Sequence, residues 1–139
     1  MADGAVNGAG SKTFAGHSSA DPSQVWAALT DAARTPDYLY GLALHSAWVP
    51  DAPIEGRRPD GVTLTGRVLC ARPGERLSYV LAAGSDDPPV YLTWMIRAHG
   101  TGCTIRLLID EIESADAVDD AEDTWLPVLA GLQQALATS

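Results

Sequence analysis

The sequence predicts an α+β fold with one curved antiparallel sheet of about six strands, a long C-terminal helix, and two short helices after the first strand. Two observations support this prediction. Through the middle of the chain, short segments alternate apolar with polar residues, and connections rich in glycine and proline separate them. Near the C-terminus, apolar residues recur at the spacing of one helix face. A sheet with one apolar face has to be covered, and this helix is the element that covers it.

The first strand and the two short helices come early in the chain. Residues 12–17 alternate in the manner of a short strand. Asp21 is a good N-cap and Pro22 suits the first helical position, where the missing N–H of proline costs nothing, so a helix is expected to begin there. A second short helix follows, and we expect Pro36 to limit it.

Five further strands are expected. The first spans residues 42–48 and is followed by a loop at residues 50–60, which contains three prolines and the basic pair Arg57-Arg58. The turn-forming residues between the later segments are typical of an antiparallel meander. The remaining four strands are predicted at residues 62–70, 76–81, 90–97 and 103–110.

The C-terminal segment predicts an amphipathic helix, because its apolar residues are three or four positions apart. Pro127 leaves two alternatives: the helix begins near Thr124 with Pro127 in its first turn, or it begins earlier and kinks there. The apolar residues on this face are Trp125, Val128, Leu129, Leu132 and Leu136.

Length and composition restrict the class of protein. The 139 residues fit one domain, at residues 12–139, after a flexible tail at residues 1–11 that is rich in glycine and alanine. Acidic residues outnumber basic ones by 18 to 9, and the net charge of −9 argues against binding to nucleic acid or to an anionic membrane surface. We see no secretory signal and no apolar stretch long enough to cross a bilayer, so we expect a soluble, cytoplasmic protein.

Several segments resemble one known family. Residues 14–30 contain Phe14 and the run Asp21-Pro22-Ser23-Gln24-Val25-Trp26-Ala27-Ala28-Leu29-Thr30. Further matching segments are Ser46-Ala47-Trp48-Val49-Pro50, Gly66-Arg67-Val68-Leu69, Pro73-Gly74-Glu75-Arg76-Leu77-Ser78-Tyr79 and Thr93-Trp94-Met95-Ile96, with Trp125, Leu129 and Leu132. Together they resemble the SRPBCC (START-like) helix-grip superfamily and, more narrowly, the activator of heat-shock-protein-90 ATPase homologue domain. The resemblance implies a helix-grip fold. This chain departs from the family at Asp51, where a glycine is usual, so we expect a rebuilt turn there.

The apolar inner face favours binding of a hydrophobic or amphipathic small molecule, including a lipid, between the sheet and the C-terminal helix. Tyr79 and His45 are the candidate polar contacts to such a ligand. A dry core closed by Trp94 and Trp125 is the alternative. The predicted lining consists of Leu64, Val68, Leu77, Tyr79, Leu81, Leu92, Trp94, Ile96, Ile105, Leu107, Trp125, Leu129 and Leu132.

Two other functions stay open. The resemblance implies a co-chaperone-like interaction with heat-shock protein 90 in the stress response, or a cavity enzyme of the polyketide cyclase, aromatase or hydrolase type. No catalytic residue is assigned, because we find no nucleophile motif and no acid–base pair.

Cofactors and partners have little support in the sequence. The three histidines lack the spacing of metal ligands, so no metal and no cofactor is expected. Cys70 and Cys103 lie in predicted strands and are expected to be reduced and packed. We expect a monomer, or a homodimer formed through sheet faces or edge strands.

Overall fold

The computed structural model describes residues 10–82, 89–112 and 115–137. Within these ranges, seven strands form one antiparallel sheet in the order β1-β7-β6-β5-β4-β3-β2. The strands are β1 (Gly10–Ser18), β2 (Ala43–Ser46), β3 (Pro53–Arg57), β4 (Thr63–Arg72), β5 (Arg76–Ala82), β6 (Val90–His99) and β7 (Gly102–Ile112). The helices are α1 (Pro22–Thr30), the single 3-10 turn η2 (Thr35–Asp37) and α2 (Ala115–Ala137).

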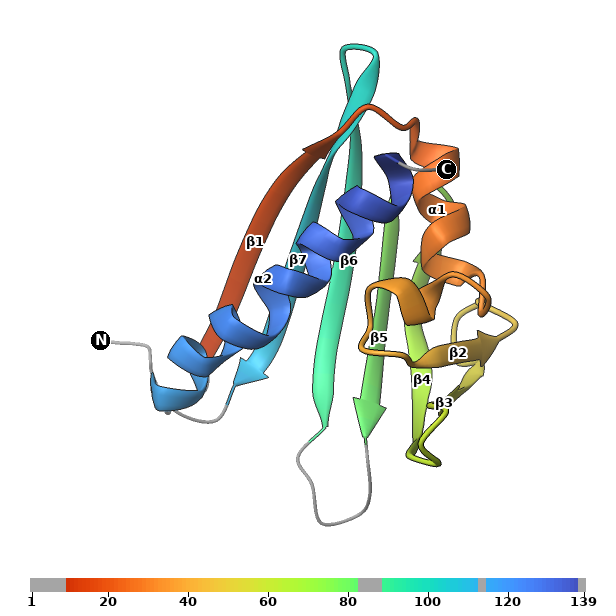
Figure 1. Ribbon diagram of the computed structural model, residues 1–139, viewed down its shortest axis with the longest axis vertical. Coiled ribbons are helices and arrows are strands. Elements are labelled where there is room, and N and C mark those ends of the chain that lie inside the picture. Colours follow the sequence, from red (N-terminus) through yellow and green to blue (C-terminus); the bar gives the residue numbers. More distant parts are fainter. Residues whose placement is uncertain (1–9, 83–88, 113–114, 138–139) are drawn as a thin grey trace.

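The helices lie on one face of the sheet. Figure 1 shows α2 running across β1, β7 and β6, with α1 beside the C-terminal end of α2. Side chains on the covered face are buried and alternate with exposed or half-buried ones, as in the pattern of β5. This is the architecture that the sequence predicts, an α+β helix-grip fold, with one strand more than the expected number.

The additional strand is β3, and the prediction of a loop at residues 50–60 is therefore wrong. Ile54 and Gly56 are buried while Glu55 and Arg57 are exposed, which is the alternation of a strand. The three prolines of the segment led to the prediction of a loop, because proline is rare inside strands. Pro53 is the first residue of β3 and lies beyond the residues that pair with β2, so its missing N–H interrupts no bond to that strand.

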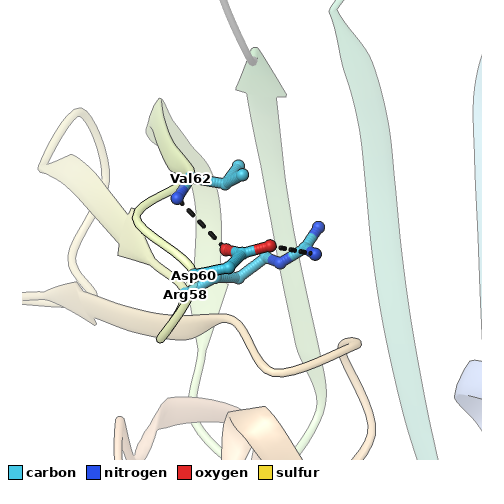
Figure 2. Close-up of polar contacts among 3 residues, drawn as sticks. All are labelled: Arg58, Asp60 and Val62. Carbon is cyan, nitrogen blue, oxygen red and sulfur yellow. Dashed lines mark hydrogen bonds and ion pairs between the residues drawn. The ribbon is translucent and has the colours of Figure 1, made fainter.

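The turn from β3 to β4 is closed by local polar contacts, which Figure 2 shows. The guanidinium of Arg58 donates to one carboxylate oxygen of Asp60 at 2.7 Å, and the other oxygen accepts from the Val62 backbone N–H at 3.2 Å. Arg57 forms an ion pair with Glu55 at 2.8 Å. The basic pair of the sequence is therefore paired with acidic neighbours in its own hairpin.

Strands β4 to β7 differ from their predicted ranges by one or two residues at their ends, and three other boundaries differ as well. Gly10 and Ser11 belong to β1 instead of the tail, and residues 1–9 of that tail lie outside the described residues. The second short helix surrounds Pro36, which lies in its first turn, where proline is tolerated, instead of ending before it. The strand predicted at residues 42–48 is shorter because Trp48 has a φ of 54°, which no strand residue adopts.

The C-terminal helix begins at Ala115, so Pro127 lies inside it. Proline has no N–H to donate to the carbonyl four residues earlier, which weakens the helix at that turn. The phenol of Tyr40 donates to the carbonyl oxygen of Thr124, one turn before Pro127. The carbonyl that Pro127 leaves without a helical donor is that of Asp123, so the bond from Tyr40 is accepted by the next residue of this weakened turn.

Candidate functional site

The residues predicted to line the space between sheet and helix lie together in one core. Leu64 and Trp125 are half-buried and pack against this core. The others are buried: Val68, Leu77, Tyr79, Leu81, Leu92, Trp94, Ile96, Ile105, Leu107, Leu129 and Leu132.

His45 does not join this group. It is exposed on β2, whereas the preceding residue, Leu44, is fully buried. Its cross-strand partner, Glu55, is exposed as well. Since successive side chains of a strand point to opposite faces, His45 lies on the face away from the helices.

Tyr79 and Trp94 form the polar centre of the core. They stand on the neighbouring strands β5 and β6, where Tyr79 pairs with Leu92 and Trp94 with Leu77. Both side chains have no solvent exposure. The indole N–H of Trp94 donates to the phenol oxygen of Tyr79 at 3.0 Å.

Two further aromatic rings contact this pair, and we call the four residues the aromatic cluster. Tyr38, just after η2, meets Trp94 edge-on with 6.0 Å between ring centroids. Trp48, just after β2, meets Tyr79 with 5.9 Å between centroids. Edge-to-face contacts of this kind add about 0.5–1.5 kcal/mol each beyond their buried area. Tyr38 is not among the predicted lining residues, because it lies outside the predicted strands and the C-terminal helix.

Trp48 is the half-buried member of the cluster. Its φ of 54° lies in the left-handed region, where a residue with a side chain is held only by its surroundings, at a cost of about 1–3 kcal/mol. The backbone N–H of Trp48 donates to the hydroxyl of Ser46 at 3.1 Å, and the indole ring of Trp48 packs on Tyr79. Trp48, in the connection from β2 to β3, is thus the part of the aromatic cluster that is exposed to solvent.

The hydroxyl proton of Tyr79 has no acceptor among the residues that the structure describes. Its oxygen accepts from Trp94, and this is its one hydrogen bond within that part of the chain. Tyr38, by comparison, donates to the carbonyl oxygen of Ala28 at 3.0 Å. Buried polar groups nearly always have a partner, supplied by protein, water or ligand. Within the described part of the chain, the Tyr79 hydroxyl is therefore a donor without an acceptor in an apolar core.

Burial determines the protonation of both phenols. It raises the pKa of Tyr79 well above the ordinary value, and the hydrogen bond from Trp94 lowers it only in part. Burial, and then the neighbouring Tyr79, raises the pKa of Tyr38 in the same direction. Both residues are neutral hydrogen-bond donors at physiological pH.

Groups for acid–base or metal chemistry are scarce around this core among the side chains that the structure describes. Among the residues whose burial is described, Ser18 and Thr35 are the other buried polar side chains. Thr35 is satisfied, since it donates to the Leu42 carbonyl at 2.9 Å and accepts from the Leu44 N–H at 3.0 Å. The described part of the chain brings together no three histidine, cysteine, aspartate or glutamate side chains that could hold a metal ion.

The two cysteines differ in burial. Both cysteines are free thiols; Cys103 is buried, while Cys70 is only half-buried. Burial, followed by the nearby Asp21, raises the pKa of the Cys103 thiol.

None of the helices, over the residues described, has the length and apolar character that crossing a bilayer requires.

Comparison with known proteins agrees with the fold. No curated protein matches the chain significantly. Among solved structures, protein MLL2253 from Mesorhizobium loti has a TM-score of 0.79 at 20% identity, over 94% of this chain and 98% of that one. CalU16 from Micromonospora echinospora has a TM-score of 0.75 at 17% identity, over 93% and 77% of the two chains. The Aha1 dimer from Colwellia psychrerythraea has a TM-score of 0.75 at 16% identity, over 91% and 96%.

The family itself follows from a match over most of the sequence. The family model described as "Activator of Hsp90 ATPase homolog 1-like protein" matches residues 19–137. This confirms the resemblance found in the sequence, from the segment around Asp21 to the C-terminal helix. The chain belongs to the family of activator of Hsp90 ATPase homologue 1-like proteins.

Proposed function

We propose that this protein binds a small hydrophobic or amphipathic molecule between the sheet and α2, and that Tyr79 donates a hydrogen bond to it. The observation that carries this proposal is the buried Tyr79 hydroxyl, whose proton has no acceptor among the described residues. Binding sites for small molecules are mostly apolar and contain a few polar groups that orient the ligand. The aromatic cluster has this composition.

The chemistry of the core selects the kind of ligand. A neutral donor in apolar surroundings favours an oxygen acceptor, such as a ketone or an ether, on an otherwise apolar body. A charged ligand is disfavoured there, because no buried cation or anion among the described residues would balance its charge. A donor left unpaired in the interior costs about 1–3 kcal/mol, and a ligand acceptor recovers that free energy.

Access to Tyr79 runs past the half-buried residues at the edge of the core. Trp48 covers one edge of the Tyr79 ring and is itself partly exposed to solvent. Trp94, which is fully buried, already donates to the hydroxyl oxygen. A ligand that reaches the hydroxyl therefore displaces the Trp48 ring, and binding is coupled to a change at the β2–β3 connection.

Native mass spectrometry of the protein as purified from cells tests this function directly. We expect a mass above that of the denatured chain, and we expect Tyr79→Phe, which keeps the ring and removes the hydroxyl, to carry less of the added mass. Tyr91→Phe is the matched control, since Tyr91 stands on the same sheet but pairs with Val80 on the face away from the helices. Equal loading of all three proteins contradicts the role given to Tyr79.

A Leu92→Trp variant tests the location of the ligand independently of its polar contact. Leu92 is fully buried opposite Tyr79, so a larger ring fills the space beside the hydroxyl. We expect loss of the added mass with retention of the fold, which circular dichroism checks. If the folded Leu92→Trp variant carries the full added mass, the ligand does not bind between the sheet and α2.

A further inference from the structure

The face of the sheet away from the helices carries a hollow of about 700 Å³. It lies over β5, β6 and β7, near the turn from β4 to β5 and the start of α1. Four arginines line it, Arg72, Arg76, Arg97 and Arg106, while Glu75 is the one acidic residue among the described residues of its lining. These are four of the nine lysine and arginine residues in a chain whose net charge is −9.

A bulge in β4 brings Arg72 to this face. Strict alternation from the buried Val68 would place residues 70 and 72 on the covered face. The register between β4 and β5 shifts between Val68 and Cys70, so that Ala71 pairs with the buried Leu77 and Arg72 with Arg76. Bulges of this kind redirect side chains and are found beside functional sites.

The register of the sheet sets the spacing of the arginines. Arg72 and Arg76 are direct cross-strand partners. Met95 pairs with Arg76 on one side and with Arg106 on the other, so these two arginines stand two strands apart, about 10 Å at their Cα atoms. Arg97 is the outward-facing residue next to Met95 on β6. Like charges directly opposite one another destabilise a sheet, so the arrangement is costly unless an anion neutralises it.

The four guanidinium groups have no ion pair with any carboxylate of the described residues. Arg57 and Arg58 differ in this respect, because each is paired with an acidic residue of its own hairpin. The guanidinium of Arg76 reaches across to the sulfur of Met95 at 3.6 Å, in the direction of β7. Apart from this contact of Arg76, the guanidinium donors meet no acceptor among the described residues, which leaves them for a ligand.

We propose that this hollow binds a small, multiply charged anion carrying phosphate or carboxylate groups. Guanidinium groups donate paired hydrogen bonds to both kinds of oxyanion, and several of them on a rigid sheet are positioned before the ligand arrives. The volume of about 700 Å³ is that of a small-molecule site. Its hollow lies on the opposite face of the sheet from the aromatic cluster, so this site is independent of the function proposed above.

Isothermal titration calorimetry at low salt, with tripolyphosphate and with citrate as separate probes, tests the proposal. We expect saturable binding of at least one probe at one site per chain, and the preferred probe distinguishes phosphate from carboxylate recognition. Removal of two charged donors in Arg76→Ala/Arg106→Ala should weaken that binding by about tenfold or more. The same double variant should melt at a higher temperature in the absence of anion, because the repulsion between arginines is reduced.

Arg67→Ala is the control for general charge. Arg67 is an exposed arginine on the same face, paired with Val80 on β5, but it does not line the hollow. We expect the affinity of the Arg67→Ala variant for the preferred probe to remain within about twofold of that of the unmodified chain, since a distant exposed charge is screened. Equal weakening by Arg67→Ala, or the absence of saturable binding at millimolar probe, overturns the proposal. A dimer that sedimentation detects without anion, and that Arg76→Glu/Arg106→Glu dissociates, overturns it as well, because a second copy would then occupy this face.

Discussion

The indole N–H of Trp94 donates to the phenol oxygen of Tyr79 at 3.0 Å, in a core where neither side chain is exposed. The bond satisfies the tryptophan and orients the tyrosine, but it uses the oxygen of Tyr79 as an acceptor. No residue that the structure describes accepts the phenol proton, which makes Tyr79 the residue on which the proposed function depends.

Tyr79→Phe is expected to change the free energy of unfolding by less than about 1 kcal/mol in ligand-free protein. The substitution removes the unpaired phenol proton but leaves the Trp94 N–H without an acceptor. The number of unpaired buried donors is therefore unchanged. Urea denaturation measures the difference, and a loss of several kcal/mol would show that the phenol proton has a partner in the folded chain.

Asp51→Gly is expected to stabilise the protein by about 0.5–1 kcal/mol. Asp51 has a φ of 70°, which is the left-handed conformation that glycine adopts without strain. Asp51→Ala is the comparison: alanine tolerates this conformation less well than aspartate and should lower stability. Thermal melts of the three proteins give the order, and a destabilised glycine variant contradicts the assignment of strain to this turn.

Tyr40→Phe should lower the free energy of unfolding by about 0.5–1.5 kcal/mol. The variant loses the hydrogen bond to the Thr124 carbonyl, which lies one turn before Pro127 in α2. The same substitution in a Pro127→Ala background should cost about the same, because the N–H of alanine would donate to the Asp123 carbonyl and leave the Thr124 carbonyl unaffected. A double-mutant cycle of chemical denaturation checks this independence, and a coupling of more than about 0.5 kcal/mol speaks against it.

Gly66→Ala should destabilise the protein by about 3 kcal/mol, since overpacking against backbone cannot relax. A Cβ at Gly66 would lie 2.1 Å from the carbonyl oxygen of Val80 on the adjacent strand. Gly16→Ala is the matched control, because its Cβ would meet the flexible end of the Gln133 side chain at 2.6 Å. Urea denaturation measures the loss in the free energy of unfolding for each variant. Equal losses would contradict the view that contact with backbone costs more than contact with a flexible side chain.

Asp21 gives α1 a stability that depends on pH. The Ser23 hydroxyl, followed by the Gln24 backbone N–H, donates to its carboxylate and holds its pKa below the ordinary 3.8. A depressed folded-state pKa stabilises the protein above the unfolded pKa, and this contribution is lost as pH falls through the folded value. Asp21→Asn keeps a capping group and removes the titration. The stability difference between the two proteins should shrink below about pH 4, which melts across pH 3–7 measure.

Much of the fold could be predicted from local patterns. The capping box of Asp21 and Gln24 is present, and the period-two segments in the middle of the chain are strands β4 to β7. β3 was missed because its buried pair, Ile54 and Gly56, is too short and too close to prolines for the pattern to stand out. Tertiary contacts, which a local pattern does not contain, determine such a segment.

The candidate site was predictable only in part. The inward residues of the sheet and of α2, including Tyr79 and Trp94, follow from alternation and helical spacing. Tyr38 and Trp48 lie in connections, where neither period applies, and the pairing of Trp94 with Tyr79 depends on strand register. The outward Arg72 depends on a bulge that the sequence does not mark.

Action on heat-shock protein 90 stays a prediction from the family resemblance. A pull-down with the chaperone, together with its ATPase rate, tests it; no capture and an unchanged rate contradict it. Dimer formation is described for the Colwellia psychrerythraea protein and stays a prediction for this chain, which sedimentation checks.

Affinity for a matched pair of probes tests the central claim most directly. Acetylnaphthalene and isopropenylnaphthalene have nearly the same shape, but only the ketone offers an acceptor to the Tyr79 hydroxyl. The unmodified protein is expected to prefer the ketone by about five- to tenfold, and Tyr79→Phe is expected to bind both equally. The same preference in both proteins, or none in the unmodified one, would contradict the role of Tyr79 as the donor to the ligand.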